Sequence, residues 1–334
     1  MKIGFFELEG WEEKIFRDQF TNDDLFFSTE KIDSDNLPKD TSYDILSIFI
    51  DSRIDKEVLN HFPNVQFIAT RSTGYEHINL SDCKEKGVLV SFVPGYADNT
   101  VAEYTFGLIL NLTRKIYQAI NQVKSKEFFS IANLRGIDLK GKTLGVIGVG
   151  RIGKEVIRIA KGFNMKVIAT NPSLDNLLAK SFGFTYVSLE DLLKNSDIIT
   201  LHCPYNASTH HLINKNNIGL IKKSAFLINT ARGGIVETEA LVSALENGAI
   251  QGAGLDVLEG ETDMKDELEL LSKKTASEEK LKTILYDHML IRMSNVLITP
   301  HIAFNSKEAL ERIVNITIEN INGFIRQKTI NLAV

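Results

Sequence analysis

Cysteine is scarce in this chain of 334 residues, which contains only Cys83 and Cys203. The two lie far apart in the sequence, and neither belongs to a CxxC motif or a Cys/His cluster. The sequence therefore predicts neither a disulfide framework nor a zinc or other metal site. We interpret both side chains as buried apolar groups rather than as reactive thiols.

An excess of positive charge and long apolar runs are also missing. The formal net charge is −5, and lysines and arginines are scattered among acids, so nucleic acid is not an expected partner. No apolar stretch approaches the ~20 residues of a membrane span, and residues 1–6 enter a strand-like run with no cationic leader. We therefore expect a cytoplasmic protein without membrane contact.

What the chain does contain is a regular rhythm of short apolar segments and amphipathic stretches. With 43% hydrophobic and 24% charged residues, it is long enough for two globular domains. The rhythm predicts βαβ units and two mostly parallel sheets. The expected strands are residues 2–6, 24–27, 45–50, 66–70 and 87–92, then 143–147, 166–170, 197–201, 225–229, 251–255 and 295–299.

Several helices follow from the same pattern. Thr100 and Glu103 predict a capping box that opens a long helix reaching about residue 123, which we interpret as the crossing into the second domain. A last amphipathic helix is expected over residues 306–325, returning to the first domain. The charged residues 265–282 are interpreted as a surface helix pair.

A glycine run in the middle of the chain predicts a nucleotide site. Gly148, Gly150 and Gly153 surround Arg151 and Ile152 just after the expected strand 143–147. In dinucleotide-binding folds the first glycine permits the sharp turn, the second lets the backbone approach a pyrophosphate, and the third lets helix pack on strand. A glycine-rich turn without a nucleotide is the alternative.

The choice between NAD and NADP depends on the end of the next strand, where an acid is expected to bind the ribose 2′-hydroxyl. The residue there is Asn171. Its amide can bind the hydroxyl but lacks the charge that repels the extra phosphate of NADP; alternatively, it only forms the turn before Pro172. Residues 173–176 contain no cation and Asp175 adds negative charge, so NAD is favoured.

Polar residues gather just after the later strands. The expected strand ends carry His202–Pro204, Thr230–Arg232, Asp256–Glu261 and Pro300–His301. Ligands of open α/β sheets bind beyond these ends. One guanidinium, several carboxylates and two imidazoles there suit the binding of an acid and the transfer of a proton.

These segments resemble the D-isomer-specific 2-hydroxyacid dehydrogenase family, most closely its D-lactate dehydrogenase-like branch. The similarity runs over nearly the whole chain, through residues 71–79 (RSTGYEHIN), 93–103 (VPGYADNTVAE), 148–153 (GVGRIG), 229–234 (NTARGG), 252–261 (GAGLDVLEGE) and 299–304 (TPHIAF). It implies a flavodoxin-like substrate domain of residues 1–99 and 302–334, a Rossmann domain of residues 100–301 inserted in it, and an active site in the cleft between them.

The resemblance also implies catalytic roles. Arg232 should bind the substrate carboxylate, and His301 should be the general acid that protonates the carbonyl oxygen. Glu261 should hydrogen-bond His301 and favour its protonated form. The alternatives are a surface cation for Arg232 and a structural role for His301. Glu259 is expected to face solvent.

Further contacts are implied for cofactor and substrate. Asp256 should lie beside the nicotinamide, and the backbone around Thr73 and Gly74 should bind the substrate carboxylate. The remaining cofactor residues are Cys203, Pro204, Thr209, Thr230 and Ala231. The side-chain pocket is expected to contain Phe49, Tyr96 and Phe304, each of which could instead be plain core.

The implied reaction is the reduction of pyruvate by NADH to D-lactate, in a homodimer. D-2-hydroxyisocaproate dehydrogenase, or another 2-oxo acid reductase of the family, is the alternative. From a different class, the same scaffold serves as an NAD-sensing corepressor, and a nucleotide-binding structural subunit is a third possibility. Glu261 argues against the related formate dehydrogenases.

Overall fold

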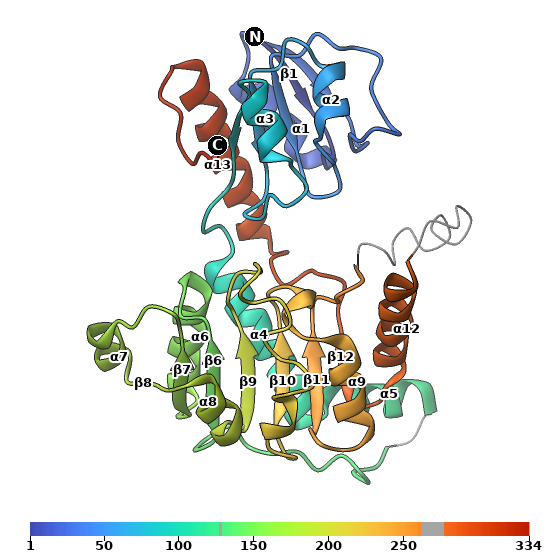
Figure 1. Cartoon of the computed structure of the whole chain (residues 1–334), viewed down its shortest axis with the longest axis vertical. Coiled ribbons are helices and arrows are strands. Elements are labelled where there is room, and N and C mark those ends of the chain that lie inside the picture. The colour runs from blue at the N-terminus through green and yellow to red at the C-terminus, as the bar shows by residue number, and fades with distance from the viewer. Residues whose placement is uncertain (127–128, 262–276, 334) are drawn as a thin grey trace. The chain divides into compact units, whose positions relative to one another are not determined.

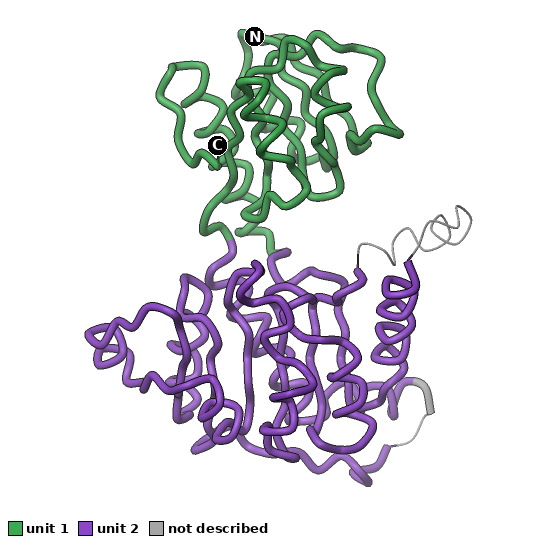
Figure 2. The backbone as a smooth tube through the Cα atoms, in the orientation of Figure 1, with its two compact units in different colours: residues 1–96, 306–334 green, residues 97–305 purple. Residues whose placement is uncertain are grey.

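Figure 1 shows the computed structural model, which describes residues 1–126, 129–261 and 277–333. The chain divides into two compact units, one of residues 1–96 and 306–334 and one of residues 97–305 (Figure 2). Each unit contains one parallel sheet with helices on both faces. The predicted fold class of two doubly wound α/β domains is therefore confirmed.

The first unit has a five-stranded sheet in the order β2-β1-β3-β4-β5. All its neighbouring strands are parallel; Ile3 of β1, for example, pairs with Leu25 of β2 and Ile45 of β3. This order is that of flavodoxin-like folds. The strands are β1 (Lys2–Phe5), β2 (Asp24–Phe27), β3 (Ile45–Ile48), β4 (Phe67–Thr70) and β5 (Leu89–Ser91).

Helices from both ends of the sequence cover this sheet. On one face, α1 (Gly10–Gln19) and α13 (Lys307–Ile325) share a core in which Val314 and Ile321 pack with Phe5. On the other face, α2 (Lys56–His61) and α3 (Leu80–Glu85) close a second core. The last helix of the chain therefore completes the first unit.

The second unit has a seven-stranded parallel sheet in the order β12-β11-β10-β9-β6-β7-β8. The order reverses direction between β6 and β9, as in a Rossmann fold extended by one strand. The sequence pattern did not predict β8. The strands are β6 (Thr143–Ile147), β7 (Lys166–Thr170), β8 (Thr185–Tyr186), β9 (Ile198–Leu201), β10 (Phe226–Asn229), β11 (Gly252–Leu255) and β12 (Val296–Ile298).

Alternating strand residues give this sheet two cores. Phe226 and Ile228 of β10 pack with α4 (Asp98–Arg114) and α6 (Arg151–Gly162), while Leu227 packs on the opposite face. That opposite face carries α8 (Leu189–Asn195), α9 (Thr238–Glu246) and α12 (Glu278–Arg292). The remaining helical segments are α5 (Ile116–Lys126), α7 (Asn176–Phe182) and the short turns Ile218–Leu220 and Gly233–Ile235.

The predicted long helix after residue 100 is wrong at both ends. The helix α4 begins at Asp98, so Thr100 lies within its first turn rather than capping it. It ends before Lys115, which adopts a left-handed conformation with φ of 54° and turns its N–H back to the last carbonyls. A new helix, α5, then begins at Ile116.

Of the predicted helix pair over residues 265–282, residues 265–276 lie outside the described residues, and α12 begins at Glu278. Among the helices that the structure describes, none has the length and apolar composition needed to cross a membrane. The cytoplasmic location stays a prediction.

Candidate active site

The glycine run forms the turn between β6 and α6, and steric contacts require two of its three glycines. Gly148 has φ of 95°, and a Cβ there would lie 2.6 Å from the backbone N of Cys203. A Cβ on Gly153 would lie 2.1 Å from the carbonyl oxygen of Gly148. A Cβ on Gly150 would meet nothing within 4 Å, so this glycine leaves open space at the start of α6. Space for a phosphate at a helix N-terminus fits a bound dinucleotide.

Asn171 connects the glycine turn to the end of β7. Its Oδ1 accepts the N–H of Val149 at 3.1 Å, and its Nδ2 donates to the carbonyl of Ser173 at 2.7 Å. Beyond it, the side chain of Asp175 caps α7 by accepting the N–H of Leu178 at 2.9 Å. The amide therefore shapes the turn, as one of the two sequence interpretations held, and also lies beside the glycine run.

The other predicted cofactor residues lie on strand-end loops of the second unit. Thr209 donates to the carbonyl of Pro204 at 2.7 Å, which closes the loop after β9, and Thr230 contacts the hydroxyl of Thr105 at 3.0 Å. Burial raises the pKa of Cys203 to about 11. Cys203 is therefore a neutral thiol at physiological pH. Arg151 and Ile152 form the first turn of α6, and Ala231 follows Thr230.

Arg232 follows β10 in a tightly fixed loop. Its carbonyl accepts the side-chain amide of Asn229 at 2.9 Å, and its Nη1 donates to the carbonyl of Ala231 at 2.9 Å. A Cβ on the next residue, Gly233, would lie 2.1 Å from the backbone of Leu258. The loop that carries Arg232 therefore packs directly on the loop after β11.

The structure brings Glu261 and His301 together. The Oε1 of Glu261 lies 2.8 Å from Nδ1 of His301, and both side chains are about one-third exposed, at 33% and 36%. Burial alone would raise the pKa of Glu261, but the hydrogen bond and charge of His301, with a smaller contribution from Arg232, lower it. All three predicted catalytic residues thus lie at the carboxyl ends of the adjacent strands β10, β11 and β12.

Asp256 holds the loop that carries His301. It is 1% exposed, and its carboxylate accepts the hydroxyl of Thr299 at 2.5 Å and the N–H groups of Ile302 at 3.0 Å and Ala303 at 2.8 Å. Burial raises its pKa, against the effect of these hydrogen bonds. His301 adopts a left-handed conformation with φ of 55°, and its N–H donates to the carbonyl of Asp256 at 2.8 Å. Such a backbone persists only where its surroundings enforce it.

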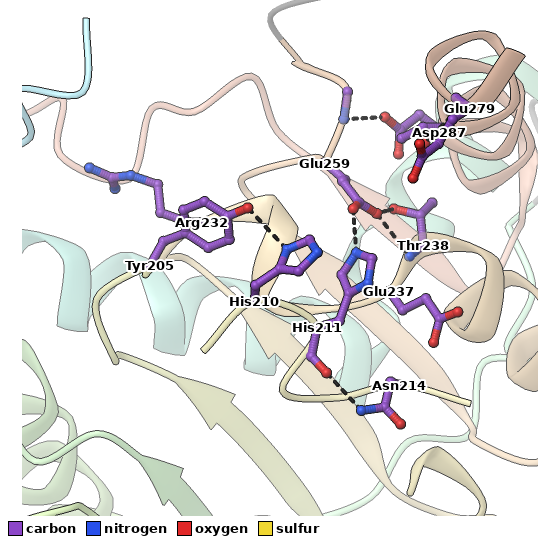
Figure 3. A network of polar contacts seen from close by, with 12 residues as sticks. Tyr205, His210, His211, Asn214, Arg232, Glu237, Thr238, Glu259, Glu279 and Asp287 are labelled. Atoms are coloured by element: carbon purple, nitrogen blue, oxygen red, sulfur yellow. Dashed lines mark hydrogen bonds and ion pairs between the residues drawn. The ribbon is translucent and has the colours of Figure 1, made fainter. Parts of the chain in front are cut away.

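A second polar network lies next to this site (Figure 3). Glu259 binds Nε2 of His211 at 2.5 Å, and its other oxygen accepts the N–H and hydroxyl of Thr238 at 3.1 and 2.7 Å. The rings of His210 and His211 stack at 3.8 Å, and His210 contacts the Tyr205 hydroxyl. The expectation that Glu259 faces solvent is wrong, because its side chain is only 19% exposed and its two oxygens bind His211 and the first residue of α9.

The predicted substrate residues of the first unit follow β3, β4 and β5. The Thr73 hydroxyl donates to the carbonyl of Val93 at 2.6 Å, whereas the backbone N–H groups of Thr73 and Gly74 donate to no residue in the described part of the chain. Tyr96 is 8% exposed, and its carbonyl accepts Arg312 Nε at 2.6 Å. Phe304 belongs to the second unit, in the loop after His301.

Two residues that the sequence reasoning missed shape this edge of the first unit. Glu7 accepts the N–H groups of Phe49, Asp51 and Ser52 at 2.9, 2.8 and 3.1 Å. Arg71 is fully buried, and its Nη2 donates to the carbonyls of residues 6 and 7 at 2.8 and 2.7 Å. For Arg71, the only signal in the sequence was a single arginine directly after an apolar strand.

The comparisons with known proteins agree with this geometry. A family model described as "D-isomer specific 2-hydroxyacid dehydrogenase, NAD binding domain" matches residues 106–303. The chain belongs to the D-isomer specific 2-hydroxyacid dehydrogenase family.

Several dehydrogenases and reductases are similar over most of their length. An aromatic 2-oxoacid reductase of Clostridium sporogenes is 38% identical over 84% of this chain and 83% of its own. A D-lactate dehydrogenase from Aquifex aeolicus, complexed with NAD and lactic acid, is 35% identical with a TM-score of 0.83, covering 98% and 96% of the two chains. A D-2-hydroxyisocaproate dehydrogenase is 30% identical with a TM-score of 0.84, covering 99% of each chain.

As a member of the D-isomer specific 2-hydroxyacid dehydrogenase family, the chain is an NAD-dependent oxidoreductase. Its relatives act on small 2-hydroxy or 2-oxo acids of different side chains. Within the described ranges, no group of three or more metal-binding side chains is present.

Proposed function

We propose that the chain is a D-lactate dehydrogenase, which converts pyruvate, NADH and a proton into D-lactate and NAD. The observation that carries this proposal is the 2.8 Å contact between His301 and Glu261, on loops next to that of Arg232. The similar D-lactate dehydrogenase of Aquifex aeolicus supports pyruvate as the substrate.

The proton is assigned to one atom of His301. Its Nδ1 faces the carboxylate of Glu261, so Nδ1 carries a hydrogen that it donates there. The exchangeable proton then resides on Nε2, which protonates the carbonyl oxygen of the 2-oxo acid. The planar guanidinium of Arg232 binds the substrate carboxylate through two parallel hydrogen bonds. NADH, when bound, supplies the hydride that C2 receives.

Residues of the first unit are also proposed as substrate-binding residues. The backbone N–H groups of Thr73 and Gly74 are suited to bind a carboxylate, since neither donates to another described residue. Phe49 and Tyr96, with Phe304 of the second unit, are proposed to contact the substrate side chain.

NAD is proposed to be preferred over NADP. Asn171 lies beside the glycine turn through its bond to Val149, and the carboxylate of Asp175 caps the next helix, α7. We propose that this negative charge disfavours a 2′-phosphate. A 2′-phosphate would find no cation among residues 172–176. A kcat/KM for NADPH equal to that for NADH would contradict this preference.

The experiment that tests the function is a steady-state assay with NADH and a series of 2-oxo acids. Pyruvate should give the highest kcat/KM, and Arg232→Ala and His301→Ala should each lower it at least ~10²-fold, the scale of lost acid catalysis. Arg17→Ala and His61→Ala, far from these loops in the sequence, serve as controls. Near-wild-type rates in either catalytic variant would refute the assigned role.

The rival functions predict other results in the same assay. A higher kcat/KM for 2-oxoisocaproate or phenylpyruvate would indicate a D-2-hydroxyisocaproate dehydrogenase or another 2-oxo acid reductase. NADH binding without turnover of any 2-oxo acid would indicate a corepressor-like or structural role.

A homodimer is proposed from the surface of α5. Ile116, Ile120 and Val123 are 40–45% exposed and share one helical face, and the neighbouring Tyr117 is 53% exposed. Contiguous exposed apolar side chains are typical of interfaces. Light scattering should give the mass of two chains, and Ile120→Asp should shift it toward one.

A further inference from the structure

A carboxyl group lies on the buried face of α12. Asp287 is 0% exposed, and it shares this face with Ile284 and Leu290, each separated from it by about one helical turn. A buried carboxyl group is costly unless it is neutral or hydrogen-bonded. The proposed reaction assigns it no role.

Asp287 binds a backbone N–H in the loop after β11, the loop that carries Glu261. Its Oδ2 accepts the N–H of Gly260 at 2.9 Å, the bond drawn as a dashed line at the top of Figure 3. A Cβ at position 260 would lie 2.8 Å from this oxygen, so glycine allows the close approach. The other oxygen, Oδ1, has no hydrogen-bond partner among the described residues.

Gly260 lies between two glutamates whose carboxylates each bind a histidine. Glu259 precedes it and binds His211, while Glu261 follows it and binds His301 at 2.8 Å. The turn is closed by the N–H of Leu258, which donates to Glu261 Oε2 at 3.2 Å. A shift of Gly260 would therefore move Glu261 relative to His301.

The surroundings favour the neutral form of Asp287. Burial raises its pKa to about 7; the Gly260 N–H opposes the rise, Glu259 and Glu261 add to it, and His288 on the same helix opposes it. On the packed helix α9, Glu239 is engaged elsewhere, with Lys282 and Tyr286. A carboxylate at 287 would thus face two others in a dry environment.

We propose that Asp287 is a positioning residue, which holds Glu261 against His301 by accepting the Gly260 N–H and needs only a neutral acceptor to do so. This inference rests on the proposed function for its catalytic consequence. The anchoring of Gly260 itself can be measured without turnover.

The test compares Asp287→Asn, Asp287→Leu and the control Tyr286→Phe, the neighbouring residue on α12. Asn keeps an acceptor of the same shape, so kcat for the best 2-oxo acid should stay within ~3-fold of wild type. Leu removes the acceptor, so kcat should fall at least ~10-fold while the KM for NADH stays within ~2-fold. Tyr286→Phe should match wild type.

Amide hydrogen exchange at Gly260 provides the readout that does not need activity. Its protection should persist in Asp287→Asn and fall at least ~10-fold in Asp287→Leu, with protection of β9 and β10 showing that the variant is folded. An unchanged kcat in a folded Asp287→Leu would overturn the proposal, as would Asp287→Asn behaving like Asp287→Leu. A wild-type protein that turns over no 2-oxo acid would refute the proposed function, while the exchange data would still decide whether Asp287 anchors the turn.

Discussion

The two units use the same device at the carboxyl edge of their sheets. In the first, Glu7 follows β1 and accepts the N–H groups of residues 49, 51 and 52, in the loop after the adjacent strand β3. In the second, Asp256 follows β11 and accepts N–H groups of residues 302–303, the loop after the adjacent strand β12. A carboxylate thus satisfies backbone donors where the strand has ended and the sheet no longer provides acceptors.

The difference lies in where the unusual backbone is located. In the first unit the left-handed residue is the acid itself, since Glu7 has φ of 56°. In the second unit the left-handed residue lies in the loop that the acid binds, since His301 has φ of 55°. We call each carboxylate, together with the N–H groups that it accepts, a clamp. The clamp of the first unit therefore orders the loop that carries Phe49. The second enforces the conformation of the proposed general acid, so the two clamps should fail in different ways.

The largest effect is expected from Asp256→Ala. This change removes the acceptor for Ile302 and Ala303 and leaves only the backbone bond between residues 256 and 301 to hold the left-handed conformation of His301. We expect kcat to fall at least ~10²-fold, as when general acid catalysis is lost. Steady-state kinetics with NADH and pyruvate measure it. Asp256→Asn keeps one oxygen acceptor and should lie between wild type and alanine; a kcat of Asp256→Ala within ~3-fold of wild type would disprove the clamp.

A smaller and different effect is expected from Glu7→Ala. Loss of the bonds to residues 49, 51 and 52 should lower the free energy of unfolding by ~2 kcal/mol, on the scale of hydrogen bonds to a partly exposed charge. Because Phe49 is proposed to contact the substrate side chain, KM for pyruvate should rise ~10-fold while kcat stays within ~3-fold. Urea unfolding and kinetics check both, with Glu7→Gln as the milder control. A fall in kcat like that of Asp256→Ala would erase the distinction between the units.

The sequence predicted most strands and both sheets, because buried parallel strands are apolar runs bounded by turn residues. It also identified the residues on the strand ends, since chemistry there follows from residue type and position. It missed Glu7, Arg71 and the second role of Asp256, whose partners are backbone groups on loops distant in the sequence. Such partners leave no mark in the residue pattern.

Local signals failed where tertiary contacts compete with them. The Thr100–Glu103 spacing fits a capping box, yet α4 begins at Asp98. The helical pattern continues past residue 114, but the carbonyl of Thr113 accepts the N–H of Ile137 at 2.8 Å, and the helix stops. Glu259 looked like a surface acid because the sequence does not show that His211 lies beside it.

The pH dependence of the free energy of unfolding tests the buried carboxyl group of Asp287 in the second unit. Burial raises the pKa of Asp287 from 3.8 to about 7, so between these values the folded chain holds a proton that the unfolded chain has lost. Stability from this group is full below about pH 4 and is lost as the pH rises through 7. Asp287→Asn cannot ionise, so its free energy of unfolding relative to wild type should increase by at least ~1 kcal/mol from pH 5 to pH 8. Urea unfolding at both pH values measures it, and a constant difference would contradict the buried neutral acid.

The smallest effects separate the two clamps most cleanly, because each carboxylate also accepts one hydroxyl. Thr299 donates to Asp256, and Ser52 donates to Glu7. Thr299→Ala and Ser52→Ala each remove one such bond, so each should lower the free energy of unfolding by ~1 kcal/mol. Only Thr299→Ala should also lower kcat, by ~3- to 10-fold, because it loosens the loop of His301; Ser52→Ala should leave kcat unchanged. Equal kcat values in the two variants, measured at saturating NADH and pyruvate, would mean that the clamp on His301 acts on stability alone.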